Sequence, residues 1–236
     1  DSTNYEVSFT GSGSDGESGI LTVKQAANSF TTELSCSDYT YAKDETPEPN
    51  ATAKFGTVTY KYATAALDGT AYKAPSDESA YTDAIPVNAG IYAVKAYVAE
   101  TDNYAGLTSD PVVFTINKAA EPTIAGEERS YAYSSGSGGK TIGVDIAGKL
   151  PTDRGTTTYA VAMTDTEQLL SEVTVDTSGN LTYKVNQVDS SKVGKTAIIT
   201  VTASMENYAN AGYTLTISIT DKKTVEIKRG NTVSVD

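Results

Sequence analysis

The side chains that most often carry out catalysis are scarce in this chain. It contains no histidine and one cysteine, Cys36, whereas Asp and Glu together number 30. Without histidine the chain lacks the commonest general base and the commonest zinc ligand, and it can form neither a Ser–His–Asp nor a Cys–His pair. A glycosidase-like pair of carboxylates stays open in principle, but no two acids are singled out by their spacing. The sequence therefore predicts a chain that is not an enzyme, with no catalytic or cofactor-binding residues.

Metal binding by oxygen ligands is the second chemistry that the sequence offers. Acids and amides gather in one segment and again further along the chain, as Glu100, Asp102, Asn103, Glu206 and Asn207. Carboxylate and amide oxygens suit calcium, so a structural calcium ion is one interpretation. In an immunoglobulin-like sandwich this loop lies at the end where the chain enters, which would set the acids against residues 26–27 and Glu121. Solvated acids in ordinary turns are the alternative that we favour, and no metal site is assigned.

Covalent cross-links are limited by the residues available. With a single cysteine, no disulfide can form within the chain. Cys36 follows the strand-like residues Leu34 and Ser35, so we expect a buried core thiol rather than a reactive one. An isopeptide bond would need a lysine and an asparagine on facing strands beside a buried acid. Lys95 with Asn117 is one such pairing, but both residue types are too common for it to carry weight.

Sixteen tyrosines and no tryptophan raise the question of sugar binding. Aromatic rings stack on sugars, but sugar platforms often use tryptophan. Most of the tyrosines fall on alternating strand positions, which fits the edges of a core and cross-strand pairs. We expect Tyr72, Tyr81 and Tyr97 to be the exposed ones, and a glycan-binding module is kept as an alternative hypothesis.

The net charge of −12 argues against nucleic acid as a partner, because phosphate binding needs a basic face. No run approaches the ~20 apolar residues of a membrane span, so this chain is not expected to insert into a membrane. The Gly-rich segments 11–16 and 134–140 lack the Walker spacing, which predicts strand connections rather than phosphate loops. No charged-then-apolar leader opens the chain, and we expect any signal and anchor to lie elsewhere in a longer protein.

Two short sequence markers recur in the same order along the chain. The dipeptide Asn-Tyr occurs at residues 4–5, 103–104 and 207–208, with spacings of 99 and 104 residues. The segment 56–60 (GTVTY) recurs as 155–159 (GTTTY). A period this long corresponds to one whole domain per repeat, so the markers predict tandem modules.

The elements that position these residues are predicted to be strands. Thr, Val, Ile and Tyr dominate, and Gly, Asp, Asn and Ser interrupt them every several residues, which is typical of an all-β fold. Residues 177–180 predict a tight hairpin turn, and residues 166–173 predict the only helix, of a turn or two. Alternation predicts an inward face that includes Val58, Tyr60, Val94, Ala96 and Val98 in the first module and Ile199, Val201 and Ala203 in the second.

These patterns divide the chain into four parts. Residues 1–25 are predicted to be the last two strands of a preceding repeat, 26–118 the first module, 119–223 the second module, and 224–236 a tail or the start of a further element. Each module is long enough to bury its own core. The junction 117–122 is short, contains Pro122 and lacks glycine, which predicts limited bending between the modules.

Several segments of the first module form a recognisable set, of which Pro-x-x-Ala-Gly-x-Tyr at 86–92 is the most specific. The set comprises 39–41 (YTY), 55–62 (FGTVTYKY), 86–92 (PVNAGIY), 100–104 (ETDNY) and 114–119 (FTINKA). With these segments the chain resembles the MBG-type immunoglobulin-like repeat modules of Gram-positive bacterial surface proteins. Residues 4–9 with 19–23 look like the end of another such repeat. The second module keeps 150–160 (LPTDRGTTTYA) but lacks the Pro-x-x-Ala-Gly entry, and it looks like a companion repeat.

The resemblance implies tandem immunoglobulin-like β-sandwich modules at the bacterial cell surface. It implies location and architecture better than a molecular role, because such modules mostly act as stalks and display units. We therefore expect a non-catalytic structural or adhesive stalk segment that is extracellular and monomeric. Its partner would be a glycan or protein of a host or microbial surface. A glycan-binding module and an accessory repeat of a large surface hydrolase are the alternatives.

Overall fold

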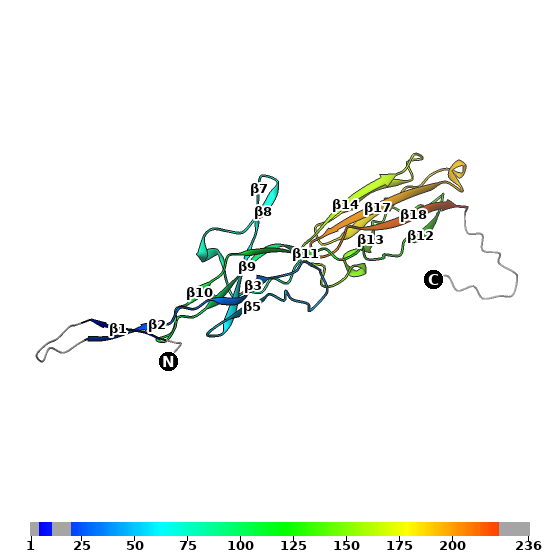
Figure 1. Cartoon of the computed structure of the whole chain (residues 1–236). Coiled ribbons are helices and arrows are strands. Elements are labelled where there is room, and N and C mark those ends of the chain that lie inside the picture. Colours follow the sequence, from blue (N-terminus) through cyan, green and yellow to red (C-terminus); the bar gives the residue numbers. More distant parts are fainter. Residues whose placement is uncertain (1–4, 11–19, 222–236) are drawn as a thin grey trace, which may run out of the picture. The chain divides into compact units, whose positions relative to one another are not determined.

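The computed structural model describes residues 5–10 and 20–221, and within them regular structure consists of strands and three short 3-10 helices. These helices are η1 (Glu78–Ala80), η2 (Ala147–Lys149) and η3 (Ser190–Lys192). The predicted all-β fold is therefore confirmed. In the part of the chain that the structure describes, no helix is long and apolar enough to cross a membrane. Contacts divide the chain into two units, Asp1–Ala119 and Ala120–Asp236, which Figure 1 shows as two β bodies.

Unit 1 begins with an antiparallel pair and continues as two sheets. Its strands are β1 (Tyr5–Thr10), β2 (Ile20–Gln25), β3 (Phe30–Ser35), β4 (Tyr39–Thr40), β5 (Asn50–Ala53), β6 (Val58–Thr64), β7 (Ala66–Asp68), β8 (Ala71–Lys73), β9 (Gly90–Val98), β10 (Leu107–Thr108) and β11 (Val112–Asn117). β9 is central in the larger sheet, because β6 pairs with one side of it and β10 and β11 with the other. β3 and β5 form the second sheet, and β7 and β8 form a separate hairpin.

The core of unit 1 lies on the face of β9 that the sequence predicted. Val94, Ala96 and Val98 are buried, as are Tyr62 of β6 and Phe114 of β11. Val58 and Tyr60 are half-buried on the same alternating set. The opposite face of β9 was not predicted to be covered, yet Ala93 and Lys95 are buried as well. A segment between β6 and β9 folds over that face.

Unit 2 is a sandwich of a four-stranded and a three-stranded sheet. Its strands are β12 (Glu127–Ala132), β13 (Ile142–Asp145), β14 (Thr157–Thr164), β15 (Leu170–Val175), β16 (Asn180–Val185), β17 (Thr196–Met205) and β18 (Ala211–Thr220). The orders are β12-β18-β17-β14 and β13-β16-β15. Ile199, Val201 and Ala203 are buried between the sheets, so the alternation predicted for β17 is confirmed.

The helix predicted at residues 166–173 is wrong, because Leu170–Val175 is strand β15. The carboxylate of Asp165 accepts hydrogen bonds from the N–H groups of Leu169 and Leu170, at 2.9 and 2.8 Å, and so closes a turn in place of a helix. Gln168 and Glu172 have positive φ angles of 56° and 53°, which a right-handed helix excludes. Leu169 and Leu170 are both buried by this turn.

The predicted hairpin turn at residues 177–180 joins β15 to β16 and is confirmed. Gly179 adopts a φ of 82°, which favours glycine. Its Cα also lies so close to Tyr159 that an added Cβ would stand 2.6 Å from the tyrosine ring. The turn therefore needs glycine for two separate reasons.

The two recurring sequence markers meet in space within each unit. In unit 1 a Cβ on Gly56 would lie 3.1 Å from the Tyr104 ring, and in unit 2 a Cβ on Gly155 would lie 3.2 Å from the Asn207 amide. Both glycines have positive φ and enter the strand that pairs with the one preceding the Asn-Tyr turn. The repeat therefore reflects one local packing arrangement used twice. The Asn-Tyr at residues 4–5 and the predicted parts 11–16 and 224–236 lie wholly or partly outside the described residues.

Candidate functional site

The segment between β6 and β9, residues 65–89, is the part of unit 1 that carries a candidate binding surface. It contains the hairpin of β7 and β8, which reverses at Gly69 with a φ of 66° and stands out from the body of the unit in Figure 1. After the hairpin, Asp77 begins η1 by accepting a hydrogen bond from Ser79 N at 2.9 Å. The segment then returns along β6 to enter β9.

Apolar and backbone contacts fix the base of this segment to the sheet. Tyr81 is buried against Ala63 of β6 and Ala93 of β9. Its hydroxyl donates to Pro75 O at 3.2 Å. The backbones of Thr82 and Tyr62 exchange two hydrogen bonds of 2.8 and 2.9 Å, so Thr82 occupies part of the free edge of β6. Burial of Tyr81 thus explains why the second face of β9 is covered.

A polar cluster joins η1 to the same face of the sheet. The Lys95 ammonium forms an ion pair with Glu78 and lies 5.0 Å from the centre of the Tyr81 ring. Hydrogen bonds from Lys95 and then Tyr97 lower the pKa of Glu78. Burial and the hydrogen bond to Glu78 raise the pKa of Tyr97 to about 12. Lys95 is therefore a paired cation that holds η1 in place.

Above this base, large apolar side chains face solvent. The exposed fractions are 61% for Leu67, 47% for Tyr72, 50% for Ile85 and 57% for Val87. Leu67 and Tyr72 are directly opposite each other in the hairpin. Ile85 and Val87 border a hollow of about 360 Å³ beside the edge of β6. We call these four side chains, two on the hairpin and two beside the hollow, the apolar surface of unit 1, and exposed apolar area is the kind of surface that interaction sites use.

The sequence located this surface only in part. Of the three tyrosines predicted to be exposed, Tyr72 is exposed, which confirms that prediction, and Tyr97 is half-buried. The prediction is wrong for Tyr81, which is buried. Leu67, Ile85 and Val87 were not singled out. The signal that was available is their position next to turn and breaker residues, since Leu67 precedes the turn at residues 68–70 and Ile85 and Val87 flank Pro86.

The acids considered for calcium are placed apart or engaged in turns. Glu100 Oε1 accepts from Gln25 Nε2 at 2.6 Å, and Asp102 is exposed. Glu206 accepts from the Thr156 N–H at 2.9 Å, while the amide of the buried Asn207 donates to Asp153 O at 2.8 Å. Among the described residues no group of three or more acidic, cysteine or histidine side chains could hold a metal ion.

A second hollow, of about 490 Å³, lies beside the turn at residues 37–48 of unit 1. Its lining includes four acids, Asp38, Asp44, Glu45 and Glu48, none of which belongs to a metal-binding group of the described residues. Asp38 already accepts from Thr115 N at 2.6 Å. That contact gives the Asp38 carboxylate a role in fixing the loop against β11.

Cys36 and the lysine–asparagine pair do not supply cross-linking chemistry. Cys36 lies just beyond β3 and is half-buried rather than buried in the core. Burial and the nearby charge of Asp38 raise the pKa of its thiol to about 11, which disfavours the reactive thiolate. Lys95 and Asn117 lie toward opposite ends of the β9–β11 pair, since Asn117 follows the Ile116–Gly90 pairing and Lys95 follows Val94. That isopeptide pairing is excluded by the register.

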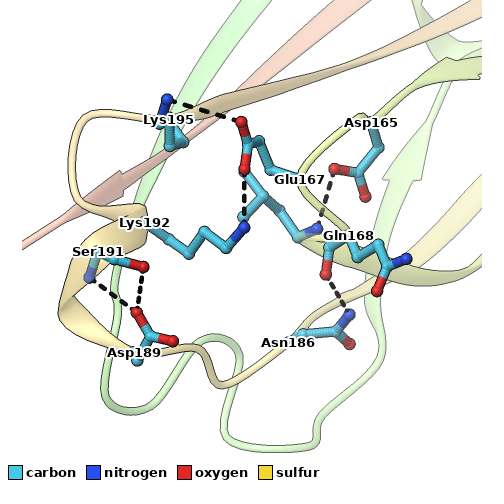
Figure 2. Close-up of polar contacts among 9 residues, drawn as sticks. Asp165, Glu167, Gln168, Asn186, Asp189, Ser191, Lys192 and Lys195 are labelled. Carbon is cyan, nitrogen blue, oxygen red and sulfur yellow. Dashed lines mark hydrogen bonds and ion pairs between the residues drawn. The ribbon is translucent and has the colours of Figure 1, made fainter.

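Unit 2 carries an ion-pair network at the end where β14 and β17 meet their turns (Figure 2). Glu167 accepts from Lys192 Nζ at 2.7 Å and lies 3.6 Å from Lys195 Nζ. The hydrogen bond and charge of Lys192 lower the pKa of Glu167. The Asn186 amide donates to Gln168 O at 2.9 Å on the other side of the turn. The network fixes the turn that follows β14 and leaves no reactive group unpaired within it.

Comparisons with known proteins give only distant structural similarities. No family model and no curated protein sequence matches the chain. The human desmocollin-1 ectodomain is 10% identical, with a TM-score of 0.31, over 94% of this chain and 49% of that one. Titin domains I67–I69 are 12% identical, with a TM-score of 0.29, over 93% of this chain and 82% of that one. Drosophila N-cadherin EC1-4 is 11% identical, with a TM-score of 0.28, over 86% of this chain and 51% of that one.

These distant similarities are to tandem immunoglobulin-like and cadherin-like β-sandwich domains. The chain spans about half the length of the desmocollin and N-cadherin structures. They assign the chain to no family, and they leave its source and location open.

Proposed function

We propose that this chain is a non-catalytic adhesive and spacing segment of a bacterial cell-surface protein, and that the apolar surface of unit 1 contacts a protein partner. The observation that carries the proposal is the concentration of exposed apolar side chains in one segment. Of the eight large hydrophobic residues exposed among the described residues, Leu67, Tyr72, Ile85 and Val87 lie within one stretch of 21 residues. Transfer of such area from water on binding is favourable.

The chemistry of this surface favours protein over sugar. Leu67, Ile85 and Val87 carry no hydrogen-bonding groups on their side chains, whereas sugars present many hydroxyl groups that need partners. Asp68 and Lys73 neutralise each other across the hairpin at 2.6 Å, so the surface adds no net charge to a chain of −12. Locally neutral apolar area with one aromatic side chain is the composition found at the centre of protein interfaces.

The second candidate function is a glycan-binding module, which Tyr72 supports as the exposed ring of the three tyrosines considered. A stacking platform of several rings is not formed there, because Tyr81 is buried and the ring of Tyr97 is overlaid by Lys61 at 5.7 Å. An accessory role beside a hydrolase domain depends on residues beyond this chain.

Adhesion of beads coated with the whole chain tests the proposal. The surfaces compared are extracellular-matrix proteins, intact host cells and a glycan array. We expect beads to bind a protein surface and the double variant Leu67→Ser, Tyr72→Ser to lose that binding. The control is Val193→Ser, which alters an exposed apolar residue of unit 2 and should bind like the unaltered chain. Binding to glycans alone, abolished by Tyr72→Ala, would favour the second candidate. Cleavage of a glycan or peptide by the pure chain would contradict a non-catalytic role.

A further inference from the structure

Strand β14 forms an outer edge of the four-stranded sheet of unit 2. It pairs antiparallel with β17 along all eight of its residues without a register shift. No strand of the described chain pairs with its other side, and Figure 1 shows β14 at the margin of its sheet. An edge of this kind presents a row of backbone donors and acceptors to solvent.

The hydrogen-bond pattern shows which residues of β14 face outward. Glu206 N donates to Thr156 O, and Ile219 N donates to Lys195 O. The backbone N–H and C=O groups of the even-numbered residues of β17 therefore point to β14, and those of the odd-numbered residues point to β18. With the register that pairs Thr158 with Ser204, the even residues of β14 are bonded to β17. The residues whose backbone N–H and C=O groups point away from β17, here called the outward residues, are Thr157, Tyr159, Val161 and Met163. No N–H group of these four has a hydrogen-bond partner among the residues that the structure describes.

The side chains of β14 do not protect this edge. Its sequence, TTYAVAMT, has no charged residue, proline or glycine, and its pairing has no bulge. Proteins usually blunt edges with such features. The other edges of unit 2 are protected. β12 carries the charged residues Glu127, Glu128 and Arg129, and β15 has a register shift after Ser171. β13 is short, with four residues. The exposure of β14 is therefore a specific property of that strand.

We propose that β14 pairs antiparallel with β14 of a second copy of this chain, about a twofold axis through Ala160. In this register Tyr159 lies opposite Val161 of the second copy, and Thr157 lies opposite Met163, each pair twice. All four outward residues of each copy then exchange backbone hydrogen bonds. Aromatic and β-branched residues directly opposite each other stabilise such pairs. The two four-stranded sheets would join as one.

A second copy suits this edge for reasons of charge. Two chains of net charge −12 repel, and that repulsion is smallest where both surfaces are neutral. The solvent face of β14 and its neighbour β17 presents only Thr158, Ala160, Ala162, Thr164, Thr196, Ile198, Thr200, Thr202 and Ser204.

The turn at the end of β14 is already fixed, which favours pairing. Asp165 caps Leu169 and Leu170, and Glu167 is held by Lys192 (Figure 2). Tyr159 is packed against Gly179 on the neighbouring hairpin. An edge ordered in advance loses little conformational entropy when a strand adds to it. This pairing departs from the monomer expected from the sequence.

Sedimentation equilibrium of the whole chain tests the association. We expect a reversible monomer–dimer equilibrium with a Kd below about 1 mM, the range of weak association. Ala160→Lys sets two lysines opposite each other at the axis and should weaken the dimer by about tenfold or more, because like charges directly opposite are destabilising. The control Thr214→Lys adds the same charge on β18, two strands inward, and should leave the equilibrium nearly unchanged. A monomer at every concentration, or equal effects of both variants, would overturn the proposal.

Disulfide trapping tests the register independently of strength. In the background Cys36→Ser, Ala160→Cys sets two thiols on a pair whose Cα atoms are about 4.5 Å apart, within disulfide range. Ala162→Cys sets its two thiols roughly 13 Å apart, four residues along the strands. Oxidised glutathione should therefore yield a covalent dimer from Ala160→Cys and not from Ala162→Cys. Dimers from Ala162→Cys, or from neither variant, would contradict this register.

Discussion

The hydroxyl of Tyr97 donates a 2.9 Å hydrogen bond to Glu78 Oε2, and this contact joins the outer face of β9 to η1. Lys95, two residues earlier on the same face, pairs with the other oxygen of the Glu78 carboxylate. One exposed carboxylate thus attaches the segment with the apolar surface to the sheet of unit 1. A single substitution at Glu78 removes both of these contacts.

Glu78→Ala should loosen residues 66–82 without unfolding unit 1. The change leaves Lys95 without its carboxylate and Tyr97 without its acceptor, whereas Tyr81 stays packed on Ala63 and Ala93. We expect faster amide hydrogen exchange in the hairpin of β7 and β8 and in η1, measured by mass spectrometry. Asp83→Asn is the control, because Asp83 lies 3.9 Å from Lys61 in an exposed pair. Exchange rates equal to those of the control would show that Tyr81 and the backbone pair of Thr82 with Tyr62 hold the segment without Glu78.

Val94→Ala should lower the free energy of unfolding of unit 1 by about 1–3 kcal/mol, as loss of buried methyl groups does. Val94 is fully buried on β9, opposite Val112 and Tyr62 in the neighbouring strands. Val113→Ala removes the same methyl groups from an exposed position and should change the free energy by less than about 0.5 kcal/mol. Urea denaturation monitored by tyrosine fluorescence measures both. Equal midpoints would reverse the assignment of the inward face.

What could be predicted from the sequence is what depends on local periodicity. The inward sets around Val94 and Val201 were found because a half-buried strand alternates with period two. The turn at Gly179 was found because glycine and asparagine tolerate positive φ. The all-β fold follows from the same two signals repeated along the chain.

What the sequence did not reveal depends on contacts between distant residues. Tyr81 was expected to be exposed, but a segment that folds back over β9 buries it against Ala93. Residues 166–173 have helix-forming composition, but the Asp165 carboxylate binds the N–H groups that a helix would use. The exposed edge of β14 likewise has no local signature, because it follows from strand order.

Gly179→Ala should destabilise unit 2 more than Gly194→Ala. Both glycines have a φ of 82°, so alanine introduces left-handed strain of about 1–2 kcal/mol at either position. A Cβ at 194 meets nothing within 4 Å, whereas a Cβ at 179 would lie 2.6 Å from the Tyr159 ring. The difference between the two losses in unfolding free energy, measured in urea, isolates the contact with Tyr159. Equal losses would mean that the Tyr159 ring moves aside at little cost.

Glu127 should make the stability of unit 2 fall in acid. Its two carboxylate oxygens lie 2.6 Å from Lys149 Nζ and 2.7 Å from Arg129 Nη2. These hydrogen bonds, that from Lys149 first, lower the pKa of Glu127 from 4.5 to about 2. Because the folded state favours the charged carboxylate, its contribution is complete above pH 4.5 and is lost as the pH falls toward 2.

Glu127→Gln should therefore lower the thermal midpoint of unfolding at pH 7. The difference in midpoint between the variant and the unaltered chain should become smaller as the pH falls below 4.5. The effect at pH 7 should be roughly 1 kcal/mol or less, since the side chain keeps 30% of its exposure and water screens the pair. Glu128→Gln is the matched control, because Glu128 is exposed on the same strand with no ion pair among the described residues. Thermal melts from pH 2 to pH 7 measure all three proteins. A difference between Glu127→Gln and the unaltered chain that stays constant across this range would show that the lost contact acts through packing rather than charge.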